Sequence, residues 1–185
     1  RRNALSPEYY AGLINGLRRA AEAPEVAAVV LAGEGGFFCA GGDLKERKGM
    51  TDEAWQAQHL VYERMIRAVI TCPLPVIGAI NGAAYGGGCE LTAALDFVYV
   101  SETARFAQTE VRIGIIPGAG GTQTLARAVG ERRAKELILS GNMFTAQDAV
   151  DWGLANRMCR AEDLMDCTLA MAETIAANAP IAVRQ

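Results

Sequence analysis

The sequence predicts an α/β fold with parallel strands, and three observations support this. Two short apolar runs, residues 26–31 and 75–80, lack the polar–apolar alternation of a half-exposed strand and are typical of strands buried on both faces. Stretches with helical spacing of apolar residues separate such runs, and glycine-rich turns follow them. Because strand, crossover helix and strand recur, a parallel sheet with helices outside it is favoured.

Capping residues and apolar spacing locate the helices. Ser6 followed by Pro7 is typical of an N-cap and a first helical position, and Thr145 is a second N-cap candidate. Pro73 and Pro75 mark the end of the helix that precedes the second apolar run. The predicted helices cover residues 7–23, 52–69, 90–95, 131–139, 146–153 and 164–177.

Strands are predicted where apolar runs end at turn residues. The run at residues 26–31 ends before the glycines of residues 33–36, and a further short strand leads into Gly41 and Gly42. The polar stretch that follows Asp43 is expected to be mobile. Residues 75–80 and 97–100 complete the predicted strands.

Composition indicates one globular domain. The chain has 185 residues, of which 51% are hydrophobic and 21% are charged, and this length suffices for a single core. The net charge of −3 argues against a broad nucleic-acid-binding surface. No apolar run reaches the roughly 18 residues of a membrane span. We therefore expect a single domain over residues 1–185, with neither nucleic acid nor a membrane as its partner.

The ends of the chain and its cysteines bear on location. The chain starts at Arg1 without a methionine and stops at Gln185, so both ends look cut, and no signal peptide is visible. Five cysteines at irregular spacing include no C-x-x-C pair, which is typical of free thiols in a reducing compartment and predicts no metal site. The expected location is the cytoplasm, or the mitochondrial matrix if a transit peptide was removed.

Three consecutive glycines, Gly86 to Gly88, stand where a strand ends and a helix begins. The first N–H groups of a helix have no intrahelical partner and carry partial positive charge. Without side chains, these N–H groups are open to a negative oxygen, as in an oxyanion hole. A tight turn for helix–strand packing explains the same triplet. The triplet matches neither the dinucleotide fingerprint nor the P-loop.

A second glycine turn repeats this arrangement. The strand at residue 37 leads into Gly41 and Gly42, and the N–H of Gly42 is available to the same oxygen. Two donors from two separate turns would polarise one carbonyl group. An ordinary loop explains this segment equally well when it is taken alone.

Two glutamates follow the glycine triplet. Glu90 lies in the first helical turn, and Glu110 precedes a second glycine-rich turn that contains Gly118. Two carboxylates in different environments can act as acid and base on one water. Stabilisation of the helix end explains Glu90, and a surface position explains Glu110.

Two other reactive side chains are assigned structural roles. His59, the one histidine of the sequence, lies in a helical stretch beside Gln58 and Tyr62 and is expected on a solvated helix face. Cys89 has no basic partner nearby in sequence and is expected to be a small packed residue.

Taken together, these segments resemble the enoyl-CoA hydratase/isomerase family, also called the crotonase family. The resemblance is carried by residues 38–45 (FCAGGDLK), 81–91 (NGAAYGGGCEL), 106–110 (FAQTE) and 114–123 (GIIPGAGGTQ), and it extends over essentially the whole chain. It implies a crotonase-like spiral of ββα units with parallel strands and helices outside, assembled into homotrimers or homohexamers. It also implies that the family's first strands and C-terminal helices lie outside residues 1–185.

The resemblance implies the chemistry as well. The backbone N–H groups of Gly42 and Gly87 would hold the thioester oxygen of an acyl-CoA. Glu90 and Glu110 would hold a water that adds to a trans-2-enoyl-CoA and gives a 3-hydroxyacyl-CoA. Coenzyme A is part of the substrate, so no separate cofactor is expected. The further residues of the implied substrate site are Gly118 in the wall, and Ala40, Leu44 and Lys45 along the coenzyme A path, with Lys45 near the phosphates.

Three other functions would use the same site residues. Isomerases of the family commonly work with the second glutamate alone, which here is Glu110. The segment Lys45-Glu-Arg-Lys48 resembles methylglutaconyl-CoA hydratases and so indicates a branched or carboxylated enoyl-CoA. A non-catalytic acyl-CoA-binding member is the third alternative, and the intact glutamate pair argues against it.

Overall fold

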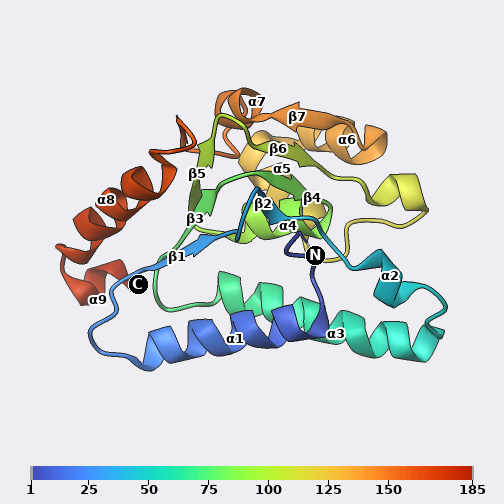
Figure 1. Ribbon diagram of the computed structural model, residues 1–185, viewed down its shortest axis with the longest axis horizontal. Helices are drawn as coiled ribbons and strands as arrows, with labels where there is room; N and C mark the ends of the chain where they lie inside the picture. Colours follow the sequence, from blue (N-terminus) through green and yellow to red (C-terminus); the bar gives the residue numbers. More distant parts are fainter. Residues whose placement is uncertain (1, 185) are drawn as a thin grey trace.

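The computed structural model describes residues 2–184, and within this range the strands form two four-stranded sheets (Figure 1). One sheet has the order β1-β3-β5-β8 and the other the order β2-β4-β6-β7. Every pairing is parallel except that of β6 with β7, which confirms the predicted α/β fold with parallel strands. The strands are β1 (Val29–Ala32), β2 (Phe37–Cys39), β3 (Val76–Ile80), β4 (Ala83–Tyr85), β5 (Phe97–Ser101), β6 (Arg105–Ala107), β7 (Met143–Thr145) and β8 (Arg157–Cys159).

The first six strands alternate between the two sheets, and this builds the predicted ββα unit. β1, β3 and β5 belong to the first sheet, and each is followed directly by its partner β2, β4 or β6 in the second. A helix comes after each of these pairs. β3 is buried along its whole length between β1 and β5, as expected for an apolar run without alternation.

The helices cover both sheets, and one of them is central. α1 and α3 pack side by side along the lower edge of the molecule in Figure 1, and α8 packs against β3 and β5 at its left side. α4 is buried along nearly its whole length. The helices are α1 (Pro7–Glu22), α2 (Leu44–Arg47), α3 (Asp52–Ile70), α4 (Gly87–Ala94), the 3₁₀ helix η1 (Glu110–Ile113), α5 (Gly121–Val129), α6 (Glu131–Ser140), α7 (Ala146–Asp151), α8 (Leu164–Ala176) and α9 (Pro180–Val183).

Two segments beside the site differ from the sequence prediction. α4 starts at Gly87 instead of residue 90, because Gly86 is its N-cap and Gly87 and Gly88 belong to its first turn. The polar stretch after Asp43 contains the short helix α2, since the Asp43 side chain accepts hydrogen bonds from the N–H groups of Lys45 and Glu46. This helix places its side chains beside the cavity described below.

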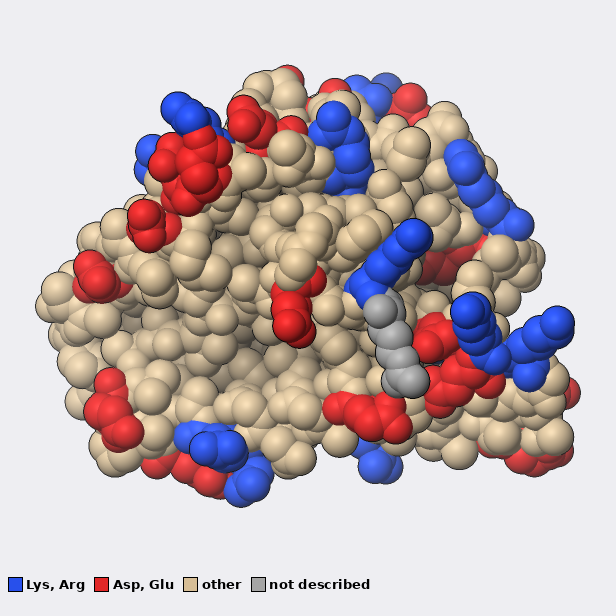
Figure 2. Space-filling view, viewed as in Figure 1, with Lys and Arg blue, Asp and Glu red and all other residues tan. Residues whose placement is uncertain are grey.

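Surface charge on the face seen in Figure 2 is mixed, with acidic and basic side chains interspersed around uncharged areas. Among the residues that the structure describes, no helix combines the length and apolar character needed to cross a bilayer.

Thr145 was predicted as an N-cap, and it forms a complete capping box with Asp148. The Thr145 hydroxyl accepts from the Asp148 N–H at 3.1 Å, and the Asp148 carboxylate accepts from the Thr145 N–H at 2.8 Å. We expect Thr145→Ala to lower the free energy of unfolding by about 1 kcal/mol. Urea denaturation would measure this. Thr122→Ala, an exposed position inside α5, is the control and should change it by less than about 0.5 kcal/mol; an equal loss in both variants would contradict the cap.

Candidate active site

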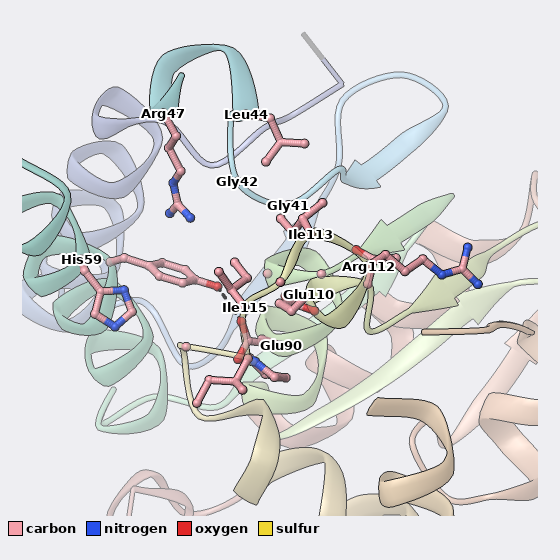
Figure 3. A pocket seen from close by; sticks show the side chains of 18 of the residues that line it. Gly41, Gly42, Leu44, Arg47, His59, Glu90, Glu110, Arg112, Ile113 and Ile115 are labelled. Carbon is pink, nitrogen blue, oxygen red and sulfur yellow. Dashed lines mark hydrogen bonds between the residues drawn. The ribbon is translucent and has the colours of Figure 1, made fainter. Parts of the chain in front are cut away.

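A cavity of about 720 Å³ lies at the N-terminus of α4 (Figure 3). Its walls come from five parts of the chain: the segment between β2 and α2, α2 itself, one face of α3, the first turn of α4 with Gly86 before it, and residues 109–118. The structure brings seven of the eight predicted site residues to this cavity, namely Ala40, Gly42, Leu44, Gly87, Glu90, Glu110 and Gly118.

Lys45, the eighth predicted residue, lines a neighbouring cavity of about 1000 Å³. This second cavity is also lined by Arg2, and three acidic residues, Glu8, Asp43 and Glu46, border it as well. The two cavities share Ala40, Gly42 and Leu44, which makes them continuous parts of one surface depression.

Glu90 projects from the first turn of α4 and is 1% exposed. Its Oε1 accepts the backbone N–H groups of Ala119 and Gly121 at 2.8 and 2.9 Å, and its Oε2 accepts the Tyr62 hydroxyl at 3.0 Å. Gly121 is required for this approach, because a Cβ there would lie 2.8 Å from Glu90 Oε1. Three donors thus fix this carboxylate from two sides.

Glu110 begins η1 directly after β6 and is 8% exposed, so it is not the surface carboxylate that its sequence position also allowed. Gln108 Nε2 donates to Glu110 Oε2 at 3.0 Å. A Cβ on Gly86 would lie 3.0 Å from Glu110 Oε1, so the glycine triplet packs against this carboxylate. Figure 3 shows Glu90 and Glu110 close together in the middle of the cavity.

Gln108 was not predicted from the sequence to be a site residue. It is 1% exposed, and among the described residues its Oε1 is a buried side-chain atom without a hydrogen-bond partner. No pattern in the sequence indicates this contact, because β6 ends at Ala107 and Thr109 already has helical backbone angles (φ −94°, ψ 0°) before Glu110.

The two carboxylates have different electrostatic surroundings. Burial raises the pKa of Glu90, and the N–H groups of Gly121 and Ala119 oppose this rise. Burial also raises the pKa of Glu110, where Gln108 is the one opposing side chain. More donors favour the ionised form at Glu90 than at Glu110. Such a pair is suited to divide the roles of base and acid.

The two glycine turns meet at the same point. A Cβ on Gly41, whose φ is +83°, would lie 2.6 Å from the Tyr85 carbonyl oxygen and 3.3 Å from the Gly87 nitrogen. A Cβ on Gly88 would lie 2.1 Å from the carbonyl oxygen of Cys39. Gly87 is the first residue of α4, so its N–H has no intrahelical acceptor. Glycine therefore allows both turns to border one cavity.

His59 does not lie on a solvated helix face, which corrects the sequence interpretation. Its side chain is 22% exposed, it stacks on Trp55 with ring centroids 4.8 Å apart, and it lines the cavity against Gly118. Tyr62, one turn further along α3, is 5% exposed. The reason is that α3 turns its apolar stripe toward the interior, and this stripe continues to Ile66, four residues after Tyr62.

The remaining reactive groups are structural. Cys89 is fully buried as predicted, and burial raises the pKa of its thiol.

Between residues 2 and 184, no three side chains of His, Cys, Asp or Glu gather in a way that could hold a metal ion.

Comparisons with known proteins agree with this arrangement. The family model for enoyl-CoA hydratase/isomerase matches residues 1–185. The chain is 42% identical over 175 residues to a mitochondrial enoyl-CoA hydratase of Pongo abelii, covering 92% of this chain and 59% of that protein. It is 40% identical over 161 residues to a short-chain-enoyl-CoA hydratase of Clostridium acetobutylicum, covering 86% and 62%. The crystal structure of an enoyl-CoA hydratase from Bacillus anthracis matches with a TM-score of 0.95 at 43% identity, covering 98% of this chain and 70% of that one.

The chain therefore belongs to the enoyl-CoA hydratase/isomerase family, the crotonase family that its motifs indicated. It spans about three fifths of the length of the Pongo abelii and Clostridium acetobutylicum relatives, 59% and 62% respectively.

Proposed function

We propose that this protein hydrates trans-2-enoyl-CoA thioesters to 3-hydroxyacyl-CoA. One observation carries the proposal: two buried carboxylates, Glu90 and Glu110, share a cavity with two glycine turns that offer backbone N–H groups. The relatives named above as enoyl-CoA hydratases support it.

The glycine turns are assigned to the thioester. The N–H groups of Gly42 and Gly87 donate to its carbonyl oxygen, which gains negative charge as the substrate becomes enolate-like. Preformed donors act most strongly on that charged state, and each is worth about 3 kcal/mol of transition-state stabilisation. A side chain at either position would narrow the cavity, since both glycines line it.

The carboxylates are assigned to the water. Glu90, whose carboxylate is oriented by its three donors, accepts a proton from the water as the oxygen adds to C3. Glu110, whose pKa is raised by burial, donates a proton to C2. Return of the proton from Glu90 to Glu110 through a water completes the cycle.

Coenzyme A is assigned to the neighbouring cavity. Ala40 and Leu44 border both cavities, so they lie along the path from the reacting carbonyl to the nucleotide. Lys45 and Arg2 supply positive charge for its phosphates. Gly118 completes the wall beside His59, where a Cβ on Gly118 would lie 2.7 Å from His59 Cε1.

A homotrimer or homohexamer is part of the same proposal, and the exposed apolar side chains of Ile116 and Leu139 are available to an interface. The family's first strands and C-terminal helices would belong to the same single domain. A location in the cytoplasm or the mitochondrial matrix stays a prediction.

Loss of the absorbance of crotonyl-CoA tests the proposed hydration. We expect a steady decrease that depends on protein concentration and stops at the hydration equilibrium. Absence of any change with short, long and branched enoyl-CoAs would contradict the proposal and favour a non-catalytic acyl-CoA-binding protein.

A carboxylated enoyl-CoA is the second candidate substrate, and Arg47 favours it. Its guanidinium lines the first cavity, where a Cβ on Gly42 would lie 3.2 Å from its Cζ. Its Nε donates to Gln58 at 3.1 Å, and across the described residues it takes part in no salt bridge. A guanidinium in this position suits the bidentate binding of a substrate carboxylate.

We expect Arg47→Met to lower kcat/KM for glutaconyl-CoA relative to crotonyl-CoA by about tenfold or more, because one charge-assisted contact is lost. Steady-state kinetics with both substrates measures the ratio. Arg112→Met is the matched control, since Arg112 lines the same cavity but bonds Asn142 and points away from the carboxylates (Figure 3). If Arg47→Met left the ratio of the two kcat/KM values unchanged, an enoyl-CoA without a carboxylate, such as crotonyl-CoA, would be the better substrate assignment.

A further inference from the structure

The side chain of Tyr62 connects α3 to α4 inside the first cavity. Its hydroxyl donates to Glu90 Oε2 at 3.0 Å, and both residues are buried. The two backbone donors, Ala119 and Gly121, bind only the other oxygen, Oε1. Tyr62 thus donates to Oε2, the carboxylate oxygen of Glu90 to which neither backbone N–H donates.

The same hydroxyl packs on the first residue of α4. A Cβ on Gly87 would lie 2.5 Å from the Tyr62 hydroxyl oxygen, so glycine at this position makes room for that hydroxyl. Tyr62 therefore stands between the proposed oxyanion donor and the Glu90 carboxylate. Its ring is held by Tyr10 and by His59, with centroids 5.5 and 6.1 Å away.

We propose that Tyr62 is a positioning residue for Glu90: its hydroxyl fixes the orientation of the carboxylate and holds it in the form that accepts a proton. This inference rests on the proposed hydration, in which Glu90 is the base. A donor to an ionised carboxylate forms one of the stronger hydrogen bonds in proteins, and its geometry restricts the rotation of the acceptor. The backbone alone would leave Oε2 without a fixed partner.

The protonation states are consistent with this role. Burial raises the pKa of Tyr62 well above its ordinary value, and Glu90 raises it further, so the hydroxyl stays a donor. Burial raises the pKa of Glu90, and the backbone donors and Tyr62 lower it; removing the hydroxyl therefore raises it. The other titratable or charged groups around this site are Glu110 and Arg112 on η1, His59 on α3, Arg47 on α2, Tyr10 on α1, Cys39 on β2 and Cys89 on α4 itself.

Tyr62→Phe tests the proposal, because it removes the hydroxyl and keeps the ring. A base works only above its pKa, so the acidic limb of the pH profile of kcat/KM should move to higher pH. At the acidic end, kcat/KM for crotonyl-CoA should fall about tenfold or more, and the loss should shrink as the pH rises. Tyr99→Phe is the matched control: Tyr99 is 6% exposed in a separate core cluster and should leave the profile unchanged.

A direct titration of Glu90 tests the role of Tyr62 without relying on catalytic activity. Carbon-13 NMR of labelled glutamate carboxyl groups follows Glu90, whose resonance is identified by its loss in Glu90→Gln. The Glu90 midpoint should be higher in Tyr62→Phe than in the unmodified protein. An unchanged midpoint, or a loss of kcat/KM by one factor at every pH, would overturn the role of Tyr62. If the unmodified protein hydrates no enoyl-CoA, the proposed function fails, while the titration still decides this inference.

Discussion

Replacing Glu110 by glutamine is expected to lower kcat for crotonyl-CoA hydration by about 100- to 10,000-fold, the range for loss of one general acid–base group. Glutamine has the same shape and can still accept the hydrogen bond from Gln108, so the cavity should keep its form. What disappears is the proton that Glu110 donates to C2. The free energy of unfolding should change little, and stopped-flow or steady-state absorbance measures the rate.

Glu90→Gln is the companion of this variant and should lose activity to a similar extent. A glutamine oxygen at this position can still accept from Ala119 and Gly121, and its amide can donate to Tyr62, whose hydroxyl then turns to accept. If only Glu110→Gln lost activity, and the product had a shifted double bond, the protein would be an isomerase that needs one carboxylate.

Replacing Gly88 by alanine is expected to lower the free energy of unfolding by about 3 kcal/mol, the upper end of the usual cost of overpacking. The added Cβ would lie 2.1 Å from the carbonyl oxygen of Cys39, a backbone atom of β2 that cannot turn away. α4 must then move from β2, which separates Gly87 from the turn at Gly42. Activity at neutral pH should fall with stability, and urea denaturation measures the latter.

Gly16→Ala is the matched control for this prediction. Gly16 lies inside α1, and a Cβ there would meet no atom within 4 Å. Alanine should therefore raise the free energy of unfolding by about 0.5–1 kcal/mol, the ordinary effect of removing glycine from a helix. Equal stability of Gly88→Ala and the unmodified protein would contradict the close contact between α4 and β2.

The parts of this fold that were predictable from sequence are those with a local cause. Apolar runs without alternation predicted β1 and β3, and capping residues predicted α1 and α7. The short strands β4, β6, β7 and β8 were not predicted, because three residues carry too little pattern and their pairing depends on the rest of the sheet. α5 was missed because its first residue, Gly121, belongs to a glycine-rich turn.

In the candidate site, too, features with a local cause were predictable from sequence, and features that depend on tertiary packing were not. Glycine runs and carboxylates identified Gly87, Glu90 and Glu110, and family resemblance assigned their chemistry. Tyr62 and His59 were not recognised, since which face of α3 is buried depends on packing against α1 and α4. A hydrogen bond between residues 28 positions apart, such as that from Tyr62 to Glu90, leaves no periodic trace in the sequence.

Incubation with trans-2-hexenoyl-CoA in water enriched in oxygen-18, followed by mass spectrometry of the product, tests the central claim most directly. Hydration by a water held between Glu90 and Glu110 predicts a 3-hydroxyhexanoyl-CoA that carries one oxygen-18 atom, and its formation should depend on both glutamates. A product of unchanged mass with a shifted double bond, or recovery of the substrate alone, would contradict it.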